Sequence, residues 1–195
     1  MIVVGITGGI GSGKTTISSV FELLGVPVYY ADDESKKIIN DDTKVYDAIL
    51  KTFGEGLKDN ENNIDRKKLS EIVFKNPEKL KQLNEIVHPA VAIHFENWLN
   101  KKSENHYVLK EAAILFESGA YKKTNKVIGV IAPLELKIKR VLQRDDITRE
   151  QIEQRVKNQL SDDEIKSRCN YIIYNDEIDL VIPQINNIHN QLMAL

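Results

Sequence analysis

Cysteine is nearly absent from the sequence: the 195 residues include one, Cys169, so no intramolecular disulfide can form. This excludes a disulfide-stapled secreted scaffold and favours a reducing compartment. Long hydrophobic runs are also missing, since no stretch approaches the ~18 apolar residues of a membrane-spanning helix. The opening apolar run, Met1–Thr7, is too short for a secretory signal and has no basic start. We therefore expect a cytoplasmic protein outside the membrane.

Neither sign of charge dominates the sequence. It contains 27 Lys and Arg against 29 Asp and Glu, and lysine and glutamate are interleaved along it. Without a basic block, the sequence predicts binding neither to nucleic acid nor to an anionic membrane surface. We interpret the lysine pairs as solvated faces. These pairs are Lys36-Lys37, Lys67-Lys68, Lys101-Lys102 and Lys122-Lys123.

The first 31 residues have the pattern of a strand, a loop, a helix and a second strand. Ile2–Thr7 is continuously apolar, as expected of a strand buried on both faces. After a glycine-rich loop, apolar residues recur at the spacing of one helix face: Ile17, Val20, Phe21 and Leu24. Gly25 ends this helix, and Val26–Ala31 is the second predicted strand. The segment therefore reads as a βαβ unit.

Three further apolar segments predict strands: Tyr107–Leu109, Lys126–Ala132 and Tyr171–Tyr174. Five short apolar strands separated by helices are typical of an α/β protein, here with a five-stranded parallel sheet flanked by helices. Residues 32–106 contain no convincing strand, although one crossover helix needs far fewer residues. We interpret them as a helical insertion that binds a substrate. Its predicted helices are Ser35–Asn40, Lys44–Phe53, Arg66–Phe74 and Pro77–Trp98.

A second long interval, residues 134–169, is charged, helical and rich in arginine. This composition suits a mobile lid over an anionic ligand, and a plain pair of surface helices explains it equally well. We therefore divide the sequence into three parts. Residues 1–31, 107–133 and 170–195 form the core with the sheet, residues 32–106 form the helical insertion, and residues 134–169 form the arginine-rich interval.

The glycine-rich loop carries the strongest functional signal. Gly8–Thr15 matches the pattern G-x-x-x-x-G-K-[ST] without a mismatch, between a buried strand and an amphipathic helix. Glycines allow successive backbone N–H groups to point inward and form a nest for phosphate. Lys14 then supplies a full charge near the β- and γ-phosphates, and the Thr15 hydroxyl is placed to bind Mg²⁺. The predicted contacts to the phosphates of ATP are Gly11, Ser12, Gly13, Lys14, Thr15 and Thr16.

The loop alone leaves the reaction open. A GTPase is disfavoured, because Asn125–Ile128 lacks the aspartate of the base-reading motif N-K-x-D. A small kinase needs a carboxylate near the acceptor hydroxyl and a second one near the metal. Asp32 and Glu111 follow the second and third strands, so both are expected at the ligand-binding edge of the sheet. Asp32 is read equally well as the N-cap of a helix over residues 33–39.

Several segments spread along the chain form a more specific combination. They are GITGGIGSGKTT, YADDESKK, FGEGL, IDRKKLSEIVF, LNEIVHPAV, ILFESG, RVLQRDDITREQIEQRVKNQ and YIIYN. The glycine loop is common to many families, whereas the His-Pro, Phe-Glu and Arg-Asp…Arg…Gln elements together are not. In this combination the sequence resembles the dephospho-CoA kinase family.

The resemblance implies a reaction and a role for each matching residue. Phosphate passes from ATP to the ribose 3′-hydroxyl of dephospho-CoA, the last step of coenzyme A biosynthesis. Asp32 orients or deprotonates this hydroxyl, Arg144 approaches the transferred phosphoryl group and Arg140 binds the phosphates of ATP. The resemblance also implies residues that form or support the acceptor pocket: Arg66, His88 and Glu117. It implies the function of the three parts as well: residues 1–31, 107–133 and 170–195 are the nucleotide-binding core, residues 32–106 the acceptor-binding part, and residues 134–169 the lid. His88 is read equally well as a packing histidine at a helix end, fixed by Pro89.

The sequence departs from the family pattern at three places. Tyr30 replaces an aspartate, Ala113 stands where proline is common, and Cys169-Asn170 replaces Ala-Asp. Two other functions stay open beside the resemblance. One is a kinase for another small acceptor, such as a nucleoside monophosphate, and the other is a nucleotide-gated binding module that hydrolyses ATP slowly. Nothing in the sequence predicts the oligomeric state.

Overall fold

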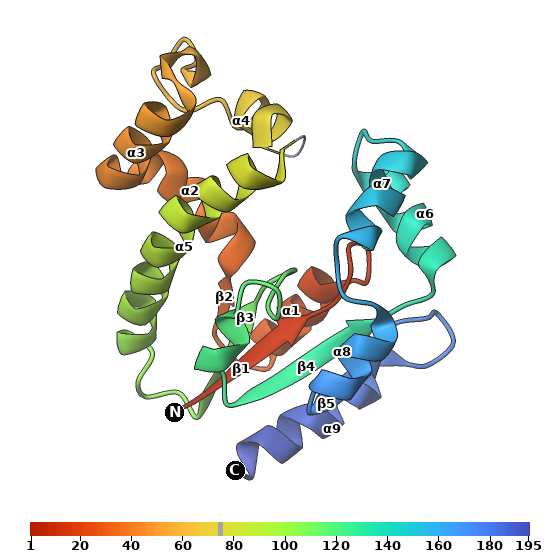
Figure 1. Ribbon diagram of the computed structural model, residues 1–195. Coiled ribbons are helices and arrows are strands. Elements are labelled where there is room, and N and C mark those ends of the chain that lie inside the picture. Colours follow the sequence, from red (N-terminus) through yellow and green to blue (C-terminus); the bar gives the residue numbers. More distant parts are fainter. Residues whose placement is uncertain (74–75) are drawn as a thin grey trace. The chain divides into compact units, whose positions relative to one another are not determined.

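A parallel sheet of five strands runs through the described part of the chain, residues 1–73 and 76–195 of the computed structural model (Figure 1). The strands are β1 (Ile2–Thr7), β2 (Val28–Tyr30), β3 (Tyr107–Glu111), β4 (Lys126–Ile131) and β5 (Tyr171–Tyr174). Their order across the sheet is β2-β3-β1-β4-β5, and every pairing is parallel. The predicted α/β class and all five strands are confirmed.

The register of the sheet places the functional segments at one edge. β1 lies in the middle, where Ile6 is opposite Glu111 of β3 and Ile128 of β4. Because all strands are parallel, the loop after β1 and the last residue of β3 meet at the carboxyl edge. This is the edge at which open α/β sheets bind ligands.

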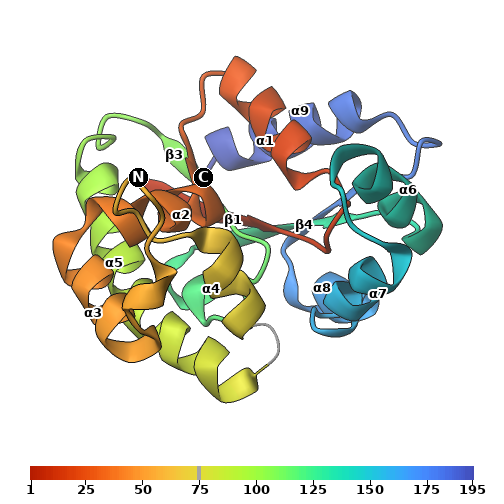
Figure 2. The same cartoon turned by 90° about the horizontal axis from the view of Figure 1, so that it is seen from above.

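Helices cover both faces of the sheet. α1 (Lys14–Leu23) and α9 (Val181–Met193) contact each other and lie over one face, and α8 (Asp162–Arg168) contacts β4 from the other (Figure 2). Ile17 and Phe21 of α1, with Ile185 of α9, are almost fully buried in the main hydrophobic core. The apolar stripe predicted for the first helix therefore packs on the sheet.

Residues 134–169 form three helices in the described structure, not a pair: α6 (Leu134–Arg144), α7 (Arg149–Lys157) and α8. Both α7 and α8 begin with a capping box, centred on Thr148 and Ser161. A small cluster of buried apolar side chains joins α6 to α7: Ile138, Val141 and Ile152. These helices therefore have a core of their own.

The chain divides into two compact units, Met1–Tyr30 with Lys102–Leu195, and Ala31–Lys101. The helices of the second unit are α2 (Ala31–Asp41), α3 (Thr43–Phe53), the 3₁₀ turn η1 (Glu55–Leu57), α4 (Arg66–Val73) and α5 (Pro77–Asn100). The side chains of Asp42 and Asn76 cap α3 and α5. Ile49 and Leu69 are buried in this unit's own hydrophobic cluster, so the unit has a core separate from that of the sheet.

The helices of residues 31–101 lie close to their predicted positions. α2 begins four residues before the predicted Ser35, because it follows β2 without a linker. Phe74, the predicted end of the Arg66 helix, lies outside the described residues. In the first unit, a further 3₁₀ turn, η2 (Ala120–Lys123), precedes β4. None of the described helices is both long and apolar enough to cross a bilayer.

Candidate active site

The glycine-rich loop joins β1 to α1 in a conformation suited to an anion. Gly11 and Gly13 have positive φ angles of 75° and 93°, and Gly13 is the N-cap of α1. The first hydrogen bond of the helix runs from the Ile17 N–H to the Gly13 carbonyl, at 3.0 Å. The amides of residues 14–16 precede this bond, at the end of the helix where backbone N–H groups point away from the helix and toward a ligand. The described structure also shows no side-chain cap there, so these amides can bind phosphate.

Close packing explains why Gly11 carries no side chain. A Cβ atom there would clash with the backbone carbonyl oxygen of Lys137 in α6. A backbone atom inside a helix cannot move aside cheaply, so the loop would have to shift. The loop conformation therefore needs glycine at position 11 for two reasons: the positive φ angle, and the close approach to the Lys137 carbonyl.

We expect Gly11→Ala to weaken ATP binding by more than about tenfold, because the loop must leave its conformation to relieve the clash. Gly25→Ala is the matched control. Gly25 also has positive φ, 83°, but its added Cβ would meet no atom within 4 Å. The control should lose about 1–2 kcal/mol of stability and keep its ATP affinity. Calorimetric titration with ATP checks both; equal ATP affinities would contradict the role given to the contact.

Lys14 lies over the loop that it follows. Its side chain is buried, with 8% exposure, and Nζ donates to the carbonyls of Gly8 at 2.8 Å and Gly9 at 3.2 Å. The ammonium is therefore held at the phosphate-binding edge by the loop itself. The predicted contact of this charge with the β- and γ-phosphates stays a prediction.

The two predicted metal ligands lie together. The Thr15 hydroxyl donates to Oε2 of Glu111 at 3.4 Å, and Glu111, at the end of β3, is 7% exposed. A hydroxyl and a carboxylate fit Mg²⁺, which accepts few protein ligands and completes its shell with water and phosphate oxygens. Among the described residues, no three His, Cys, Asp or Glu side chains are grouped so that they could hold a metal ion by themselves.

Asn175 joins Arg140 to the loop. Its Nδ2 donates to the carbonyl of Ser12 at 2.8 Å, and its backbone carbonyl accepts from Nη1 of Arg140 at 3.1 Å. Arg140 also pairs with Glu177 at 3.3 Å. The Ser12 hydroxyl is buried and has no hydrogen-bond partner in the described structure. Asn175 was missing from the predicted site, although its position directly after β5 follows the rule that selected Asp32 and Glu111.

Arg144, at the end of α6, is occupied elsewhere. Its Nε and Nη2 both donate to the carboxylate of Asp145 at 2.8 Å, and 64% of its side chain is exposed. The hydrogen bonds from Arg144 hold the pKa of Asp145 below its ordinary value. In the described structure Arg144 makes no hydrogen bond to the loop, so contact with a phosphoryl group would require it to leave or share Asp145.

Glu117 contacts the chain after α7. Its Oε1 accepts a hydrogen bond from the backbone N–H of Leu160 at 3.1 Å. Tyr30, where the resemblance expects an aspartate, donates its hydroxyl to Glu22 at 2.8 Å. Burial raises the pKa of Tyr30 to about 12, so it is a neutral phenol at pH 7 and supplies none of the charge of an aspartate.

The structure corrects the alternative readings of Asp32 and His88. Asp32 is the second residue of α2, inside its first turn, so it is not the N-cap of this helix. His88 lies within α5, which continues past Pro89 to Asn100, and its side chain is exposed. The interpretation of His88 as a packing residue at a helix end is therefore wrong.

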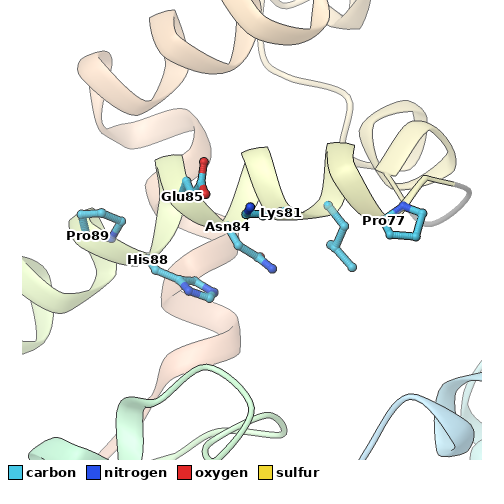
Figure 3. Close-up of a pocket in the computed structure, with 7 residues that line it drawn as sticks. Pro77, Lys81, Asn84, Glu85, His88 and Pro89 are labelled. Atoms are coloured by element: carbon cyan, nitrogen blue, oxygen red, sulfur yellow. The ribbon is translucent and has the colours of Figure 1, made fainter.

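Two surface hollows lie within the unit of residues 31–101. The first, of about 650 Å³, runs along one face of α5, from which Asn84 and His88 project to the same side (Figure 3). Pro89 has no N–H to donate to the Glu85 carbonyl on this face. The second hollow is polar and is lined by Arg66 of α4 and by residues of α2: Asp33, Lys36, Lys37, Asn40 and Asp41.

Comparison with known proteins covers most of the chain. The family model described as dephospho-CoA kinase matches residues 2–179. Dephospho-CoA kinase of Bacteroides fragilis is 39% identical over 184 residues, 94% of this chain and 89% of that relative. The solved dephospho-CoA kinase from Campylobacter jejuni is 28% identical, with a TM-score of 0.71 over 98% of this chain and 97% of the other. A crystal structure of a Thermus thermophilus protein, 27% identical, reaches 0.84 over 99% and 96%.

Proposed function

The chain belongs to the dephospho-CoA kinase family, and on this premise we propose how its own residues carry out the reaction. The reaction is the ATP-dependent phosphorylation of dephospho-CoA to CoA, the last step of coenzyme A biosynthesis. The observation that carries this assignment is the family match over residues 2–179, which includes the phosphate loop and all the helices of residues 31–101. We assign the ribose 3′-hydroxyl as the acceptor atom.

The phosphate loop binds ATP. The amides at the start of α1 and the ammonium of Lys14 hold the β- and γ-phosphates, supported by the open N-terminus of α1 and by the buried position of Lys14. Arg140 approaches the phosphates from α6, because it is tied through Asn175 to the carbonyl of Ser12. Thr15 and Glu111 would hold Mg²⁺, which neutralises phosphate charge when it is bound.

We expect Thr15→Val to raise the Mg²⁺ concentration needed for half-maximal activity roughly tenfold or more, because valine keeps the shape of threonine without its oxygen. Thr15→Ser is the control, since serine keeps the hydroxyl. ADP release measured across a Mg²⁺ titration at fixed ATP checks the pair. An equal Mg²⁺ requirement for valine and serine would remove Thr15 from the metal site.

On the acceptor side, Asp32 orients or deprotonates the 3′-hydroxyl, which attacks the γ-phosphorus in line. Arg144 exchanges Asp145 for the transferred phosphoryl group and neutralises its charge. Arg66, His88 and Glu117 form or support the acceptor pocket. No covalent enzyme intermediate is needed, because positioning and charge neutralisation supply most of the catalysis in such transfers.

Residues 134–169 act as the lid, and residues 32–106 as the acceptor-binding part. Closure of the exposed part of the lid, around Arg144 and Asp145, excludes water and limits wasteful hydrolysis of ATP, while residues 159–168 stay anchored to the loop and the sheet. The exposed pair of Arg144 and Asp145 supports this assignment, since an exposed arginine can change partners at low cost. We place the reaction in the cytoplasm, where ATP is available and a single cysteine is unremarkable.

ADP release measured with and without dephospho-CoA tests the function, together with mass spectrometry that locates the new phosphate. We expect release to depend on dephospho-CoA and the phosphate to lie on the ribose 3′-oxygen. Release that depends instead on a nucleoside monophosphate or another small acceptor would overturn the acceptor assignment. Slow release that no acceptor stimulates would indicate a nucleotide-gated binding module.

A further inference from the structure

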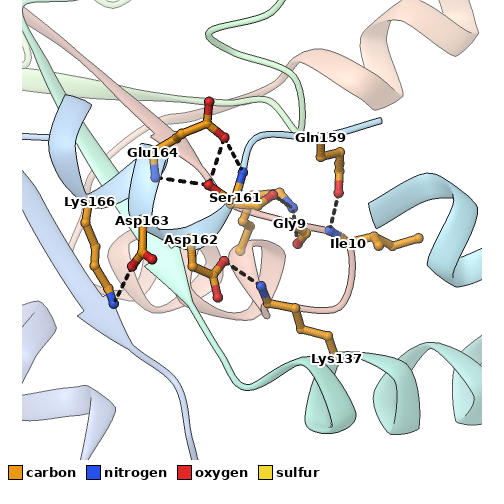
Figure 4. A network of polar contacts seen from close by, with 11 residues as sticks. Gly9, Ile10, Lys137, Gln159, Ser161, Asp162, Asp163, Glu164 and Lys166 are labelled. Carbon is orange, nitrogen blue, oxygen red and sulfur yellow. Dashed lines mark hydrogen bonds and ion pairs between the residues drawn. The ribbon is translucent and has the colours of Figure 1, made fainter. Parts of the chain in front are cut away.

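The segment of residues 159–162, from the linker after α7 to the first residue of α8, is tied to three other parts of the nucleotide-binding unit. Figure 4 shows two of the ties: Oε1 of Gln159 accepts from the Ile10 N–H at 2.8 Å, and Asp162 pairs with Lys137 at 2.6 Å. The third is the hydrogen bond from the Leu160 N–H to Glu117 at 3.1 Å. Residues 159–162 are therefore fixed to the phosphate loop, to the turn after β3 and to α6.

The tie to the phosphate loop is reinforced by packing. The side chain of Ile10 packs against the cluster formed by Ile138, Val141 and Ile152 of α6 and α7. The side chain of Ile10 thus packs against the core of these helices, and its amide donates a hydrogen bond to Gln159. The motif G-x-x-x-x-G-K-[ST] leaves the residue at this loop position unspecified, so neither contact follows from the motif itself.

The far end of the segment is equally well held. Lys137 is 5% exposed, so its ion pair with Asp162 is shielded from water. Ser161 caps α8 through reciprocal hydrogen bonds with Glu164, and α8 contacts β4 of the sheet. Because the segment is anchored to the sheet, the oxygen of Gln159 is a fixed acceptor and not a mobile surface group.

We propose that Gln159 is a positioning residue for ATP binding, because its side chain fixes the first half of the phosphate loop through the Ile10 amide. Glu117 in turn holds residues 159–162 in place by accepting the hydrogen bond from the Leu160 N–H. The proposal rests on the proposed function for its substrate, ATP. Gln159 touches neither phosphate nor acceptor in this account. It acts through the loop, whose amides must already point inward when the triphosphate arrives.

This role predicts a particular split of the kinetic constants. Without the oxygen of Gln159 the free loop samples other conformations, and ATP must restore the binding conformation at a cost in affinity. Once ATP has ordered the loop, the transfer step is unchanged. The KM for ATP should therefore rise while kcat and the KM for dephospho-CoA stay close to their wild-type values.

The test compares Gln159→Met with Gln159→Glu. Methionine keeps the chain length without the acceptor oxygen, and glutamate keeps the oxygen. We expect the methionine variant to raise the Kd and KM for ATP roughly tenfold, with kcat changed less than about threefold, and the glutamate variant to stay within about threefold of wild type in all constants. Lys166→Gln, which breaks an exposed pair with Asp163 in α8, should change none of them.

Calorimetry with ATP alone supplies the Kd, and hydrogen exchange of the Ile10 amide reports the contact directly. Faster exchange of that amide with a raised Kd supports the proposal. Unchanged Kd, or a parallel loss of kcat and of affinity for both substrates with a lower melting temperature, overturns it. Should the methionine variant not fold, Gln159→Asn shortens the side chain by one methylene and takes its place.

The two proposals fail separately. The calorimetric result needs no acceptor, so it stands whichever molecule receives the phosphate. Conversely, the proposed function is contradicted if dephospho-CoA does not stimulate ADP release by the wild-type protein. The measured effect of Gln159 on ATP binding would still stand in that case.

Discussion

Lys14→Ala is expected to abolish measurable turnover, with kcat lowered roughly 10³-fold or more. The ammonium of Lys14 is buried over the phosphate loop, where few water molecules screen its charge. Alanine removes this positive charge from the place where negative charge on the transferred phosphoryl group must be stabilised in the transition state. It also leaves the carbonyls of Gly8 and Gly9 without the hydrogen bonds that Lys14 donates.

ADP release at saturating ATP and dephospho-CoA measures this effect. Lys166→Ala is a suitable control, because Lys166 is an exposed lysine that pairs only with Asp163 of its own helix among the described residues. The control should keep the wild-type kcat. A Lys14→Ala enzyme with more than about a tenth of the wild-type kcat would show that the loop amides suffice for catalysis.

Asp32→Asn is expected to lower kcat by roughly 10²–10⁴-fold and to leave ATP affinity within about twofold of wild type. Asparagine keeps the size of the side chain and one acceptor oxygen but has neither the charge nor the basicity of a carboxylate. ATP affinity is spared because the phosphate contacts come from the loop and from Lys14. The two constants therefore separate the role of Asp32 from that of the loop.

Asp33→Asn is the matched control, one residue along the same helical turn. The carboxylate of Asp33 pairs with Lys36 at 2.6 Å on an exposed surface, so its loss should change kcat less than about twofold. Rapid-quench single turnovers measure the chemical step itself. If Asp32→Asn transfers phosphate at the wild-type single-turnover rate, Asp32 has no part in activating the acceptor.

The sheet and the contact between Thr15 and Glu111 could be predicted because each rests on a simple rule. Continuous apolar runs predict buried parallel strands, and the carboxyl ends of such strands share one edge. Thr15 and Glu111 are 96 residues apart, yet this rule brings them together, and the structure places their oxygens 3.4 Å apart.

Other features of the candidate site leave no local pattern in the sequence. The hydrogen bond from the Ile10 amide to Gln159 spans 149 residues and joins a backbone group to a side chain. No periodic pattern in the sequence therefore predicts it. Pro89 suggested a helix end beside His88, but α5 continues because packing of its apolar face outweighs one missing hydrogen bond. Both the Ile10–Gln159 hydrogen bond and the continuation of α5 past Pro89 depend on contacts between residues that are distant in the sequence.

A crystal structure with dephospho-CoA and a non-hydrolysable ATP analogue tests the central claim most directly. The account predicts the triphosphate on the amides of residues 11–16 and the ammonium of Lys14, with the ribose 3′-hydroxyl within hydrogen-bonding distance of the Asp32 carboxylate. A triphosphate bound away from the loop, or a 3′-hydroxyl far from Asp32 in the complete complex, would contradict it.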